Sequence, residues 1–244
     1  MHSADDAMKA PLLTLHRAGV RFGDVAALRD IDLTVHRGDR IAIVGANGGG
    51  KTTLLRLLHG LVPNSGRREV HVMHPEGRTP AAAMLFQRPF LLSMTARWNV
   101  LLGLWLRGVP RAQRLERCNA ALHRVGLERL AGRAARALSG GQQQRLALAR
   151  AWALQPDVML LDEPTANLDP SAKHEVEELI DGLCADGVTI VMTTHNLGQA
   201  KRLSTRIVYL EDGRIVSDLP TDRFFNDTLP PQAAQFLRGE LPWN

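Results

Sequence analysis

A glycine-rich segment with one lysine and one hydroxyl side chain has the clearest chemistry in this chain. Residues 45–52 read GANGGGKT, after a short apolar run at 40–44 and before a helical pattern over 52–59 that stops at Gly60. Glycines at a helix start let backbone N–H groups converge on phosphate oxygens. Lys51 would pair with the phosphates and contact only ligand, and the Thr52 hydroxyl would ligate Mg²⁺. The alternative is a glycine-rich turn that merely precedes a helix.

A pair of carboxylates follows a second apolar run. Asp162 and Glu163 end residues 158–161, which are typical of a central parallel strand. One carboxylate at such a strand end could hold the Mg²⁺ shell, and the other could polarise an attacking water. Acidic residues are also common helix caps, so the pair alone would be a weak signal.

The segment Leu138-Ser139-Gly140-Gly141-Gln142 supports two interpretations. Ser139 and Gln142 have capping-box spacing, before a helix expected over 142–154. Two glycines in a first turn are nevertheless poor helix formers, which favours close approach of their N–H groups to a ligand. Capping and phosphate binding use the same N–H groups, so both interpretations can hold.

Two polar side chains stand at the ends of further expected strands. Gln87 follows residues 83–86, and His195 closes the apolar run 188–194. A glutamine before a loop or a lone histidine is usually structural. Their positions after two strands of the same expected parallel sheet make them candidates for the phosphate site.

Composition fits a globular protein that needs no disulfides. The 244 residues are 45% hydrophobic, and Cys118 and Cys184 show no metal-ligand spacing. No apolar run approaches the ~20 residues of a membrane span, and residues 1–6 are too polar for a secretory signal. The net charge of +5 is local, because residues 107–136 hold eight arginines and two glutamates. A solvated helical face or attraction to an anionic membrane would explain this stretch.

Strands that alternate with helices predict an α/β fold with a mostly parallel sheet. Alternating strands at 12–35 turn near residues 22–24 and 37–39, and 207–210 and 214–216 form a hairpin pattern. Residues 93–137 are rich in Leu, Ala and Arg and predict an inserted helical subdomain. A short helix is expected around 233–237. We expect one domain over 1–244: a nucleotide-binding core (12–92 and 138–218), the helical subdomain and a C-terminal tail (219–244).

Taken together, GANGGGKT, LSGGQ, the 158–163 strand end and His195 resemble the ATP-binding cassette (ABC) ATPases over about residues 12–218. The resemblance implies a P-loop NTPase core with an antiparallel β subdomain and the helical insertion. It also implies Asp162 as a Mg²⁺ ligand with Thr52 and Gln87, Glu163 as the base, and His195 and Gln87 as γ-phosphate contacts. Nucleotide-binding residues would be Phe22, Gly45, Ala46, Asn47, Gly48, Gly49, Gly50, Lys51, Thr52, Thr53, Ser139, Gly140, Gly141 and Gln142.

Phe22 lies 29 residues before Lys51, where the family has an aromatic side chain that stacks on adenine, but a strand aromatic in the core would explain it equally. Gly49 often stands as serine in the family. Since the position acts through its backbone, we expect glycine to add only flexibility.

The resemblance further implies partners. In the family LSGGQ binds the ATP held by another subunit, and the loop around Asp169 contacts that subunit, so we expect a head-to-tail homodimer on ATP. Separate membrane permeases would dock against Phe90, Leu91, Leu92, Trp98 and Trp105, although core packing would also explain these residues. The ATPase would be cytoplasmic, on the inner face of the plasma membrane, with a periplasmic solute-binding protein as an indirect partner. Segments 195–200 and 236–241 resemble ATPases of tungstate- or phosphate-type importers.

Two other functions remain possible. One is a non-transport ABC ATPase that acts on nucleic acid or the ribosome, but such proteins tend to carry coiled-coil insertions or tandem cassettes. Here 50 residues separate Gln87 from Leu138, and we expect no nucleic-acid partner. The other is a regulator that binds ATP without useful turnover, against which the presence of both Glu163 and His195 argues.

Overall fold

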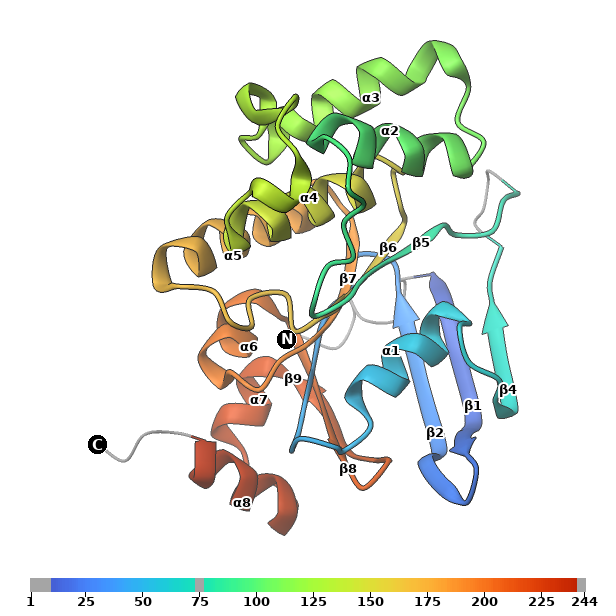
Figure 1. Cartoon of the computed structure of the whole chain (residues 1–244). Coiled ribbons are helices and arrows are strands. Elements are labelled where there is room, and N and C mark those ends of the chain that lie inside the picture. The colour runs from blue at the N-terminus through green and yellow to red at the C-terminus, as the bar shows by residue number, and fades with distance from the viewer. Residues whose placement is uncertain (1–9, 73–76, 241–244) are drawn as a thin grey trace.

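A six-stranded sheet forms the centre of the computed structural model, which describes residues 10–72 and 77–240 (Figure 1). The strand order is β5-β6-β7-β3-β8-β9, and neighbours run parallel except for the β8–β9 hairpin. Short apolar runs buried on both faces form the central strands. The bounds are β3 (Arg40–Val44), β5 (Ala82–Leu85), β6 (Val158–Asp162), β7 (Thr189–Thr193), β8 (Arg206–Glu211) and β9 (Arg214–Pro220).

A second, antiparallel sheet has the order β2-β1-β4. It lies to the right of the helix α1 in Figure 1. Leucines on α1 are fully buried between the two sheets and share one apolar core with both. This core therefore fixes the start of α1 relative to the parallel strands. The bounds are β1 (Pro11–Phe22), β2 (Val25–His36), β4 (Ser65–Val70) and α1 (Lys51–His59).

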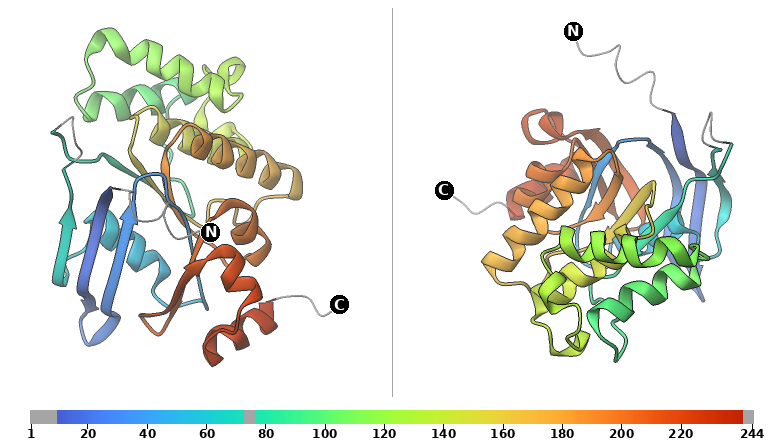
Figure 2. Two further views of the ribbon diagram at one scale, coloured as in Figure 1. Left: turned by 180° about the vertical axis from the view of Figure 1, so that it is seen from behind. Right: turned by 90° about the horizontal axis from the view of Figure 1, so that it is seen from above.

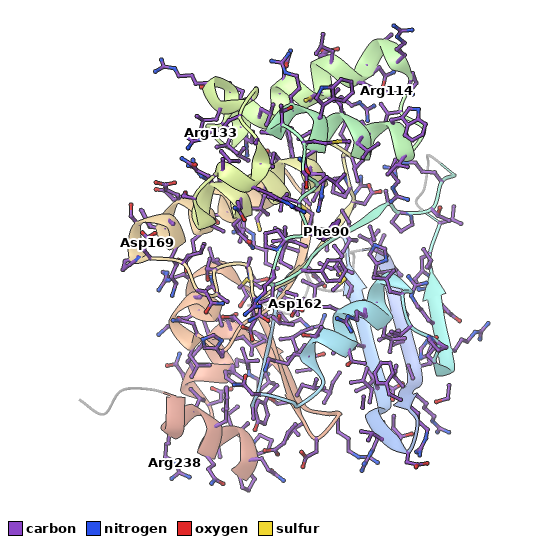
Figure 3. The ribbon with its side chains drawn as sticks, viewed as in Figure 1. Phe90, Arg114, Arg133, Asp162, Asp169 and Arg238 are labelled. Atoms are coloured by element: carbon purple, nitrogen blue, oxygen red, sulfur yellow. The ribbon has the colours of Figure 1, made fainter. Side chains whose placement is uncertain are left out.

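A helical lobe stands at one end of the molecule (Figure 1). It has its own apolar core, to which the long helix α4 contributes Leu146 and Ala149. The arginine-rich stretch lies in this lobe, with Arg114 and Arg133 at opposite ends of its outer side (Figure 3). Of its eight arginines, Arg124 pairs with Asp186, and the structure shows no carboxylate partner for the others within the described residues. The helices are α2 (Ala96–Leu106), α3 (Arg111–Arg124), η2 (Glu128–Leu130), η3 (Ala135–Ala137) and α4 (Gly140–Trp152).

The other face of the parallel sheet is covered by four more helices, and the last two lie at the end opposite the helical lobe (Figure 2). Phe236 packs on Tyr209 of β8 with ring centroids 5.1 Å apart, which fastens the C-terminal segment to the sheet. Cys184 lies in this layer as a free thiol, and burial raises its pKa to about 11. The helices are α5 (Pro170–Ala185), α6 (Leu197–Leu203), α7 (Thr221–Asn226) and α8 (Pro231–Glu240).

The fold class is as the sequence predicts: a mostly parallel sheet, an antiparallel sheet and a helical lobe. Strand β4 is an addition that the sequence did not indicate. Two sequence interpretations rest partly on residues outside the described part of the chain. These are residues 1–6, used to argue against a secretory signal, and Leu241, the last residue of the segment that resembles importer ATPases. Within the described part, no helix has the length and apolar character that crossing a bilayer requires.

Candidate nucleotide site

Three of the four glycines in residues 45–50 adopt backbone conformations that other residues rarely reach. Gly45, Gly48 and Gly50 have φ values of 146°, 80° and 101°. A Cβ on Gly45 would lie 2.1 Å from the carbonyl oxygen of Leu210, so β8 leaves no room for a side chain there. The segment therefore needs glycine to turn from β3 into α1. At Gly49 a Cβ would lie 3.1 Å from the Ala46 carbonyl oxygen, so this position is also crowded, which the sequence did not indicate.

Lys51 is buried, and its side chain is already engaged. Its Nζ donates to the carbonyl oxygens of Gly45, at 2.8 Å, and Ala46, at 2.9 Å. The expectation that Lys51 contacts only ligand is therefore wrong. A buried ammonium needs acceptors when no anion is present, and the loop carbonyls provide them.

Thr52 and Asp162 are hydrogen-bonded neighbours although 110 residues separate them. Thr52 Oγ1 donates to Asp162 Oδ1 at 3.0 Å. Thr193 Oγ1, from the end of β7, donates to the same carboxylate oxygen at 2.7 Å and accepts from the Glu163 N–H at 3.0 Å. A hydroxyl beside a carboxylate at a phosphate loop is an oxygen donor set that suits Mg²⁺. The role of Thr193 was missed, although it stands two residues before His195.

Glu163 lies between the two polar side chains expected to join it. Gln87 Nε2 donates to Glu163 Oε2 at 3.1 Å, and His195 Nδ1 lies 3.5 Å from the same oxygen. The Glu163 side chain is 15% exposed and that of His195 is 58% exposed. Glu163 also has a φ of 44°, a left-handed conformation that is costly for a residue with a Cβ. Three strand ends of the parallel sheet thus aim side chains at one point.

One cavity of about 870 Å³ is lined by most of these groups, although not by Asp162 or Thr193. Its volume is within the range of small-molecule sites. It includes Gln87, Glu163 and His195 and most of the glycine segment. Residues that the sequence analysis did not single out extend it beyond Glu163. The lining residues are Ala27, Gly45, Ala46, Asn47, Gly48, Gly50, Lys51, Thr52, Thr53, Gln87, Glu163, Thr165, Ala166, Asn167, Leu168, Lys173, Thr194, His195, Asn196 and Gln199.

The Ser139 segment begins α4 and forms a full capping box. The Gln142 N–H donates to Ser139 Oγ at 3.3 Å, and the Ser139 N–H donates to Gln142 Oε1 at 3.1 Å. Gly141 has a packing role as well, because a Cβ there would lie 2.6 Å from Ala172 Cβ on α5. The capping interpretation is confirmed, and one of the two first-turn glycines is explained by helix packing.

Some predicted site residues do not line this cavity. Phe22 is 49% exposed at the tip of the β1–β2 hairpin, so it is not a core aromatic. The residues from Ser139 to Gln142 are not among the lining residues of their own chain. Asp169 caps α5 through the N–H groups of Ser171 and Ala172, at the start of that helix and away from Asp162 (Figure 3).

The apolar residues after Gln87 divide into two groups. Phe90, Trp98 and Trp105 are 71%, 59% and 57% exposed. Leu91 instead packs in the core of the helical lobe. The prediction that Leu91 contacts a permease is therefore wrong, and core packing explains this residue. Asn99 holds the intervening loop by bonding both the N–H and the carbonyl of Leu92. The loop therefore presents Phe90 outward between the sheet and the lobe (Figure 3).

Comparison with known proteins now decides the family. The family model described as ABC transporter matches residues 28–166. The chain belongs to the ABC transporter ATPase family. It is 39% identical to the phosphate import ATP-binding protein PstB 2 of Natronomonas pharaonis, over 92% of this chain and 86% of that one. It is 34% identical to the glutamine transport ATP-binding protein GlnQ of Geobacillus stearothermophilus, over 93% and 98%.

A solved structure gives the same result at the level of the fold. The ATP-binding cassette MJ0796, in a dimeric post-hydrolysis state bound to ADP and Pi, superposes with a TM-score of 0.74. The two chains are 30% identical over 86% of this chain and 99% of that one. This protein is therefore an ABC ATPase with a P-loop fold, a nucleotide-binding subunit of the kind found in importers.

Proposed function

We propose that this chain is the ATP-hydrolysing subunit of an ABC importer and couples pairing of two copies to transport through separate permeases. One observation carries the proposal. A single cavity brings together the lysine of the glycine segment, Thr52, and Glu163 with Gln87 and His195, and Asp162 lies behind its wall, hydrogen-bonded to Thr52. Phosphoryl transfer needs such an arrangement of positioned cations, oxygen donors and a carboxylate.

The loop would bind the phosphates of ATP. Residues at the start of α1 line the cavity, and their backbone N–H groups would bind phosphate oxygens. Lys51 would exchange its contacts with the Gly45 and Ala46 carbonyls for phosphate oxygens. Thr52 and Asp162, with Gln87 nearby, would hold Mg²⁺ directly or through water. The ion would neutralise the charge that develops on the phosphate oxygens.

Glu163 would act on the attacking water. Its carboxylate would accept the proton, or orient the water, at Oε2 or Oε1. His195, 3.5 Å away, would hold Glu163 in place and reach the γ-phosphate. Gln87 donates to Glu163 here at 3.1 Å and would change partner when nucleotide occupies the cavity. A change at Gln87 would be transmitted to the helical lobe, since residues 88–95 connect the two.

A second copy would complete each site. Because Ser139 and its neighbours do not line their own cavity, a head-to-tail partner is the natural source of these groups. The α4 N-terminus would then contact the γ-phosphate held by the partner. Asp169 would lie at the same contact, and Phe22, which is exposed on the hairpin whose second strand contributes Ala27 to the cavity lining, would stack on adenine.

Permeases would dock on the exposed apolar side chains between the core and the helical lobe. Phe90, Trp98 and Trp105 each expose a large apolar side chain that a permease could cover. Residues 93–137 would act as the helical subdomain that carries this surface, beside the core at 12–92 and 138–218 and the tail from 219. The complex would place this subunit on the inner face of the plasma membrane, with a periplasmic binding protein delivering the solute.

For the cargo, we propose an oxyanion such as phosphate or tungstate. The 39% identity to a phosphate import protein supports this class. A glutamine transport protein at 34% identity makes an amino acid the alternative. Uptake of radiolabelled phosphate, tungstate and glutamine by cells with and without the gene separates them. Loss of glutamine uptake alone would contradict the oxyanion proposal.

The site itself is tested by Glu163→Gln, which keeps the shape of the side chain and removes its negative charge. We expect ATP turnover to fall by roughly 10²–10⁴-fold, the usual contribution of a positioned base. ATP affinity by calorimetry should be preserved, and an ATP-bound dimer should accumulate in sedimentation. Turnover near the wild-type rate in this variant would show that the base lies elsewhere.

A further inference from the structure

A buried polar cluster joins the two segments that carry Glu163 and His195. Gln199 on α6 is 1% exposed, Glu177 on α5 is 6% exposed, and Thr165 in the loop after β6 is 9% exposed. Gln199 Nε2 donates to Thr165 Oγ1 at 2.8 Å and to Glu177 Oε1 at 3.1 Å. The other carboxylate oxygen, Glu177 Oε2, accepts from Arg202 at 2.6 Å. The cluster thus joins three segments: the loop after β6 through Thr165, α5 through Glu177, and α6 through Gln199 and Arg202.

Gln199 is fixed at both its backbone and its side chain. Its N–H donates to Asn196 Oδ1 at 2.8 Å, and Asn196 directly follows His195. Its amide nitrogen holds Thr165, two residues after Glu163. The hydrogen bonds of Gln199 therefore connect the histidine segment to the glutamate segment.

Glu177 determines which way the Gln199 amide points. An ionised carboxylate only accepts hydrogen bonds, so the amide nitrogen has to face Glu177. The same nitrogen then lies within reach of Thr165. A buried carboxylate is tolerated only with such partners, and Arg202 supplies the compensating charge.

The cluster is also part of the site, because Thr165 and Gln199 both line the cavity that contains Glu163 and His195. Glu163 has the left-handed φ of 44°, a conformation that the surrounding structure has to impose. The 3.5 Å separation between Glu163 and His195 depends on two loops that leave different strands. A direct link between those loops is what would keep that separation constant.

We propose that Gln199 is a positioning residue for ATP hydrolysis, and that it holds the Glu163 loop against the His195 segment through Thr165 while Glu177 orients its amide. The inference rests on the roles proposed above for Glu163 and His195. Gln199 does not touch the reacting groups in this assignment. It acts by keeping the Glu163 carboxylate and the His195 imidazole at a constant separation when nucleotide binds.

The test is Gln199→Met, which keeps the length of the side chain and removes both hydrogen-bond donors. We expect kcat to fall by roughly 10- to 100-fold, since small misplacements of a catalytic group have effects of this size. KM and the calorimetric Kd for ATP should stay within about twofold of wild type, because Lys51 and the glycine loop are untouched. Mere loss of stability would lower the melting temperature without this selective loss of kcat.

Ser204→Ala is the matched control. Ser204 is buried at the end of the same helix, and its hydroxyl bonds the Ala200 carbonyl oxygen at 2.6 Å and Thr221 Oγ1 at 3.2 Å, away from the cavity. This variant should lower the melting temperature and leave kcat unchanged at 25 °C.

A second variant breaks the link from the loop side. Thr165→Val keeps the shape of the side chain and removes the hydrogen-bond acceptor, so it should reproduce the kcat loss of Gln199→Met. It also replaces Gln199→Met as the test if the Gln199→Met protein does not fold. The double variant should be no slower than the worse single one, because both remove the same hydrogen bond.

Three results would overturn the inference. A kcat within twofold of wild type in either single variant, alongside the expected loss in Glu163→Gln, would reject positioning by Gln199 and leave the proposed site intact. Full additivity of the two kcat effects would reject the shared link. Normal turnover in Glu163→Gln would instead reject the proposed site and, with it, the inference.

Discussion

At the scale of single residues, Lys51 is the most informative side chain. Its ammonium bonds two carbonyl oxygens of its own loop at 2.8 and 2.9 Å, so the loop is held in shape before any phosphate arrives. Lys51→Ala removes both the phosphate contact and these loop contacts. We expect tight Mg-ATP binding to be lost in calorimetry, with the circular dichroism of the fold retained.

The melting temperature provides the control for that prediction. Loss of the two Nζ hydrogen bonds should lower it modestly, since each is a bond from a charged donor. Unchanged ATP affinity in a folded Lys51→Ala protein would remove the basis for assigning residues 45–52 to the phosphates.

Most of the site residues could be predicted, and the reason is local. Lys51, Asp162 and His195 each stand where an apolar run or a glycine segment ends, and parallel strands bring such ends to one edge. Gln199 and Thr165 could not be predicted, because neither ends a strand and their contact joins different elements. The role of Thr193 could have been predicted, because this residue ends β7 as Asp162 ends β6.

At the scale of elements, the contact between α4 and α5 controls how the Ser139 segment is presented. Gly141 lets these helices approach, and a Cβ there would lie 2.6 Å from that of Ala172. Gly141→Ala should therefore overpack the contact and cost about 1–3 kcal/mol in the free energy of unfolding, measured in urea.

Ala172→Gly in the same chain is the matched test of that explanation. Removal of the opposing methyl should restore part of the lost stability. If Gly141→Ala is as stable as the wild type, the close approach in the structure is not a constraint on the helices.

Elements were predictable in proportion to their apolar patterns. The strand expected at 40–44, apolar from Ile41 to Val44, became β3 with the expected bounds, and Gly60 ends α1 in a left-handed conformation. Strand β4 was missed because its sequence, SGRREV, has one apolar residue and lies at a sheet edge. Its register comes from pairing with β1, which no local pattern encodes.

At the scale of the whole molecule, the two halves of the proposed catalytic unit lie apart within one chain. Ser139 caps α4, whereas Lys51 lies in the cavity. Ser139→Ala alone should cost ~1 kcal/mol as a lost cap and should also weaken dimerisation in ATP. The two effects separate when Ser139→Ala subunits are mixed with Lys51→Ala subunits.

In a head-to-tail mixed dimer both lesions fall on one composite site, and the other site stays whole. Turnover should then rise above that of either variant alone. Two outcomes together would contradict this prediction: Glu163→Gln sediments only as a monomer in ATP, and turnover does not recover when the two variants are mixed. Ser139 would then act as a helix cap and nothing more.

The left-handed backbone at Glu163 also has a consequence for engineering. The φ of 44° suits glycine or asparagine better than glutamate, so the chain gives up conformational stability at the residue proposed as its base. Selection for thermostability alone would favour substitution of this glutamate and would yield proteins that are more stable but do not hydrolyse ATP. A thermostable version of this ATPase therefore has to be selected for turnover and melting temperature together, with residue 163 held constant.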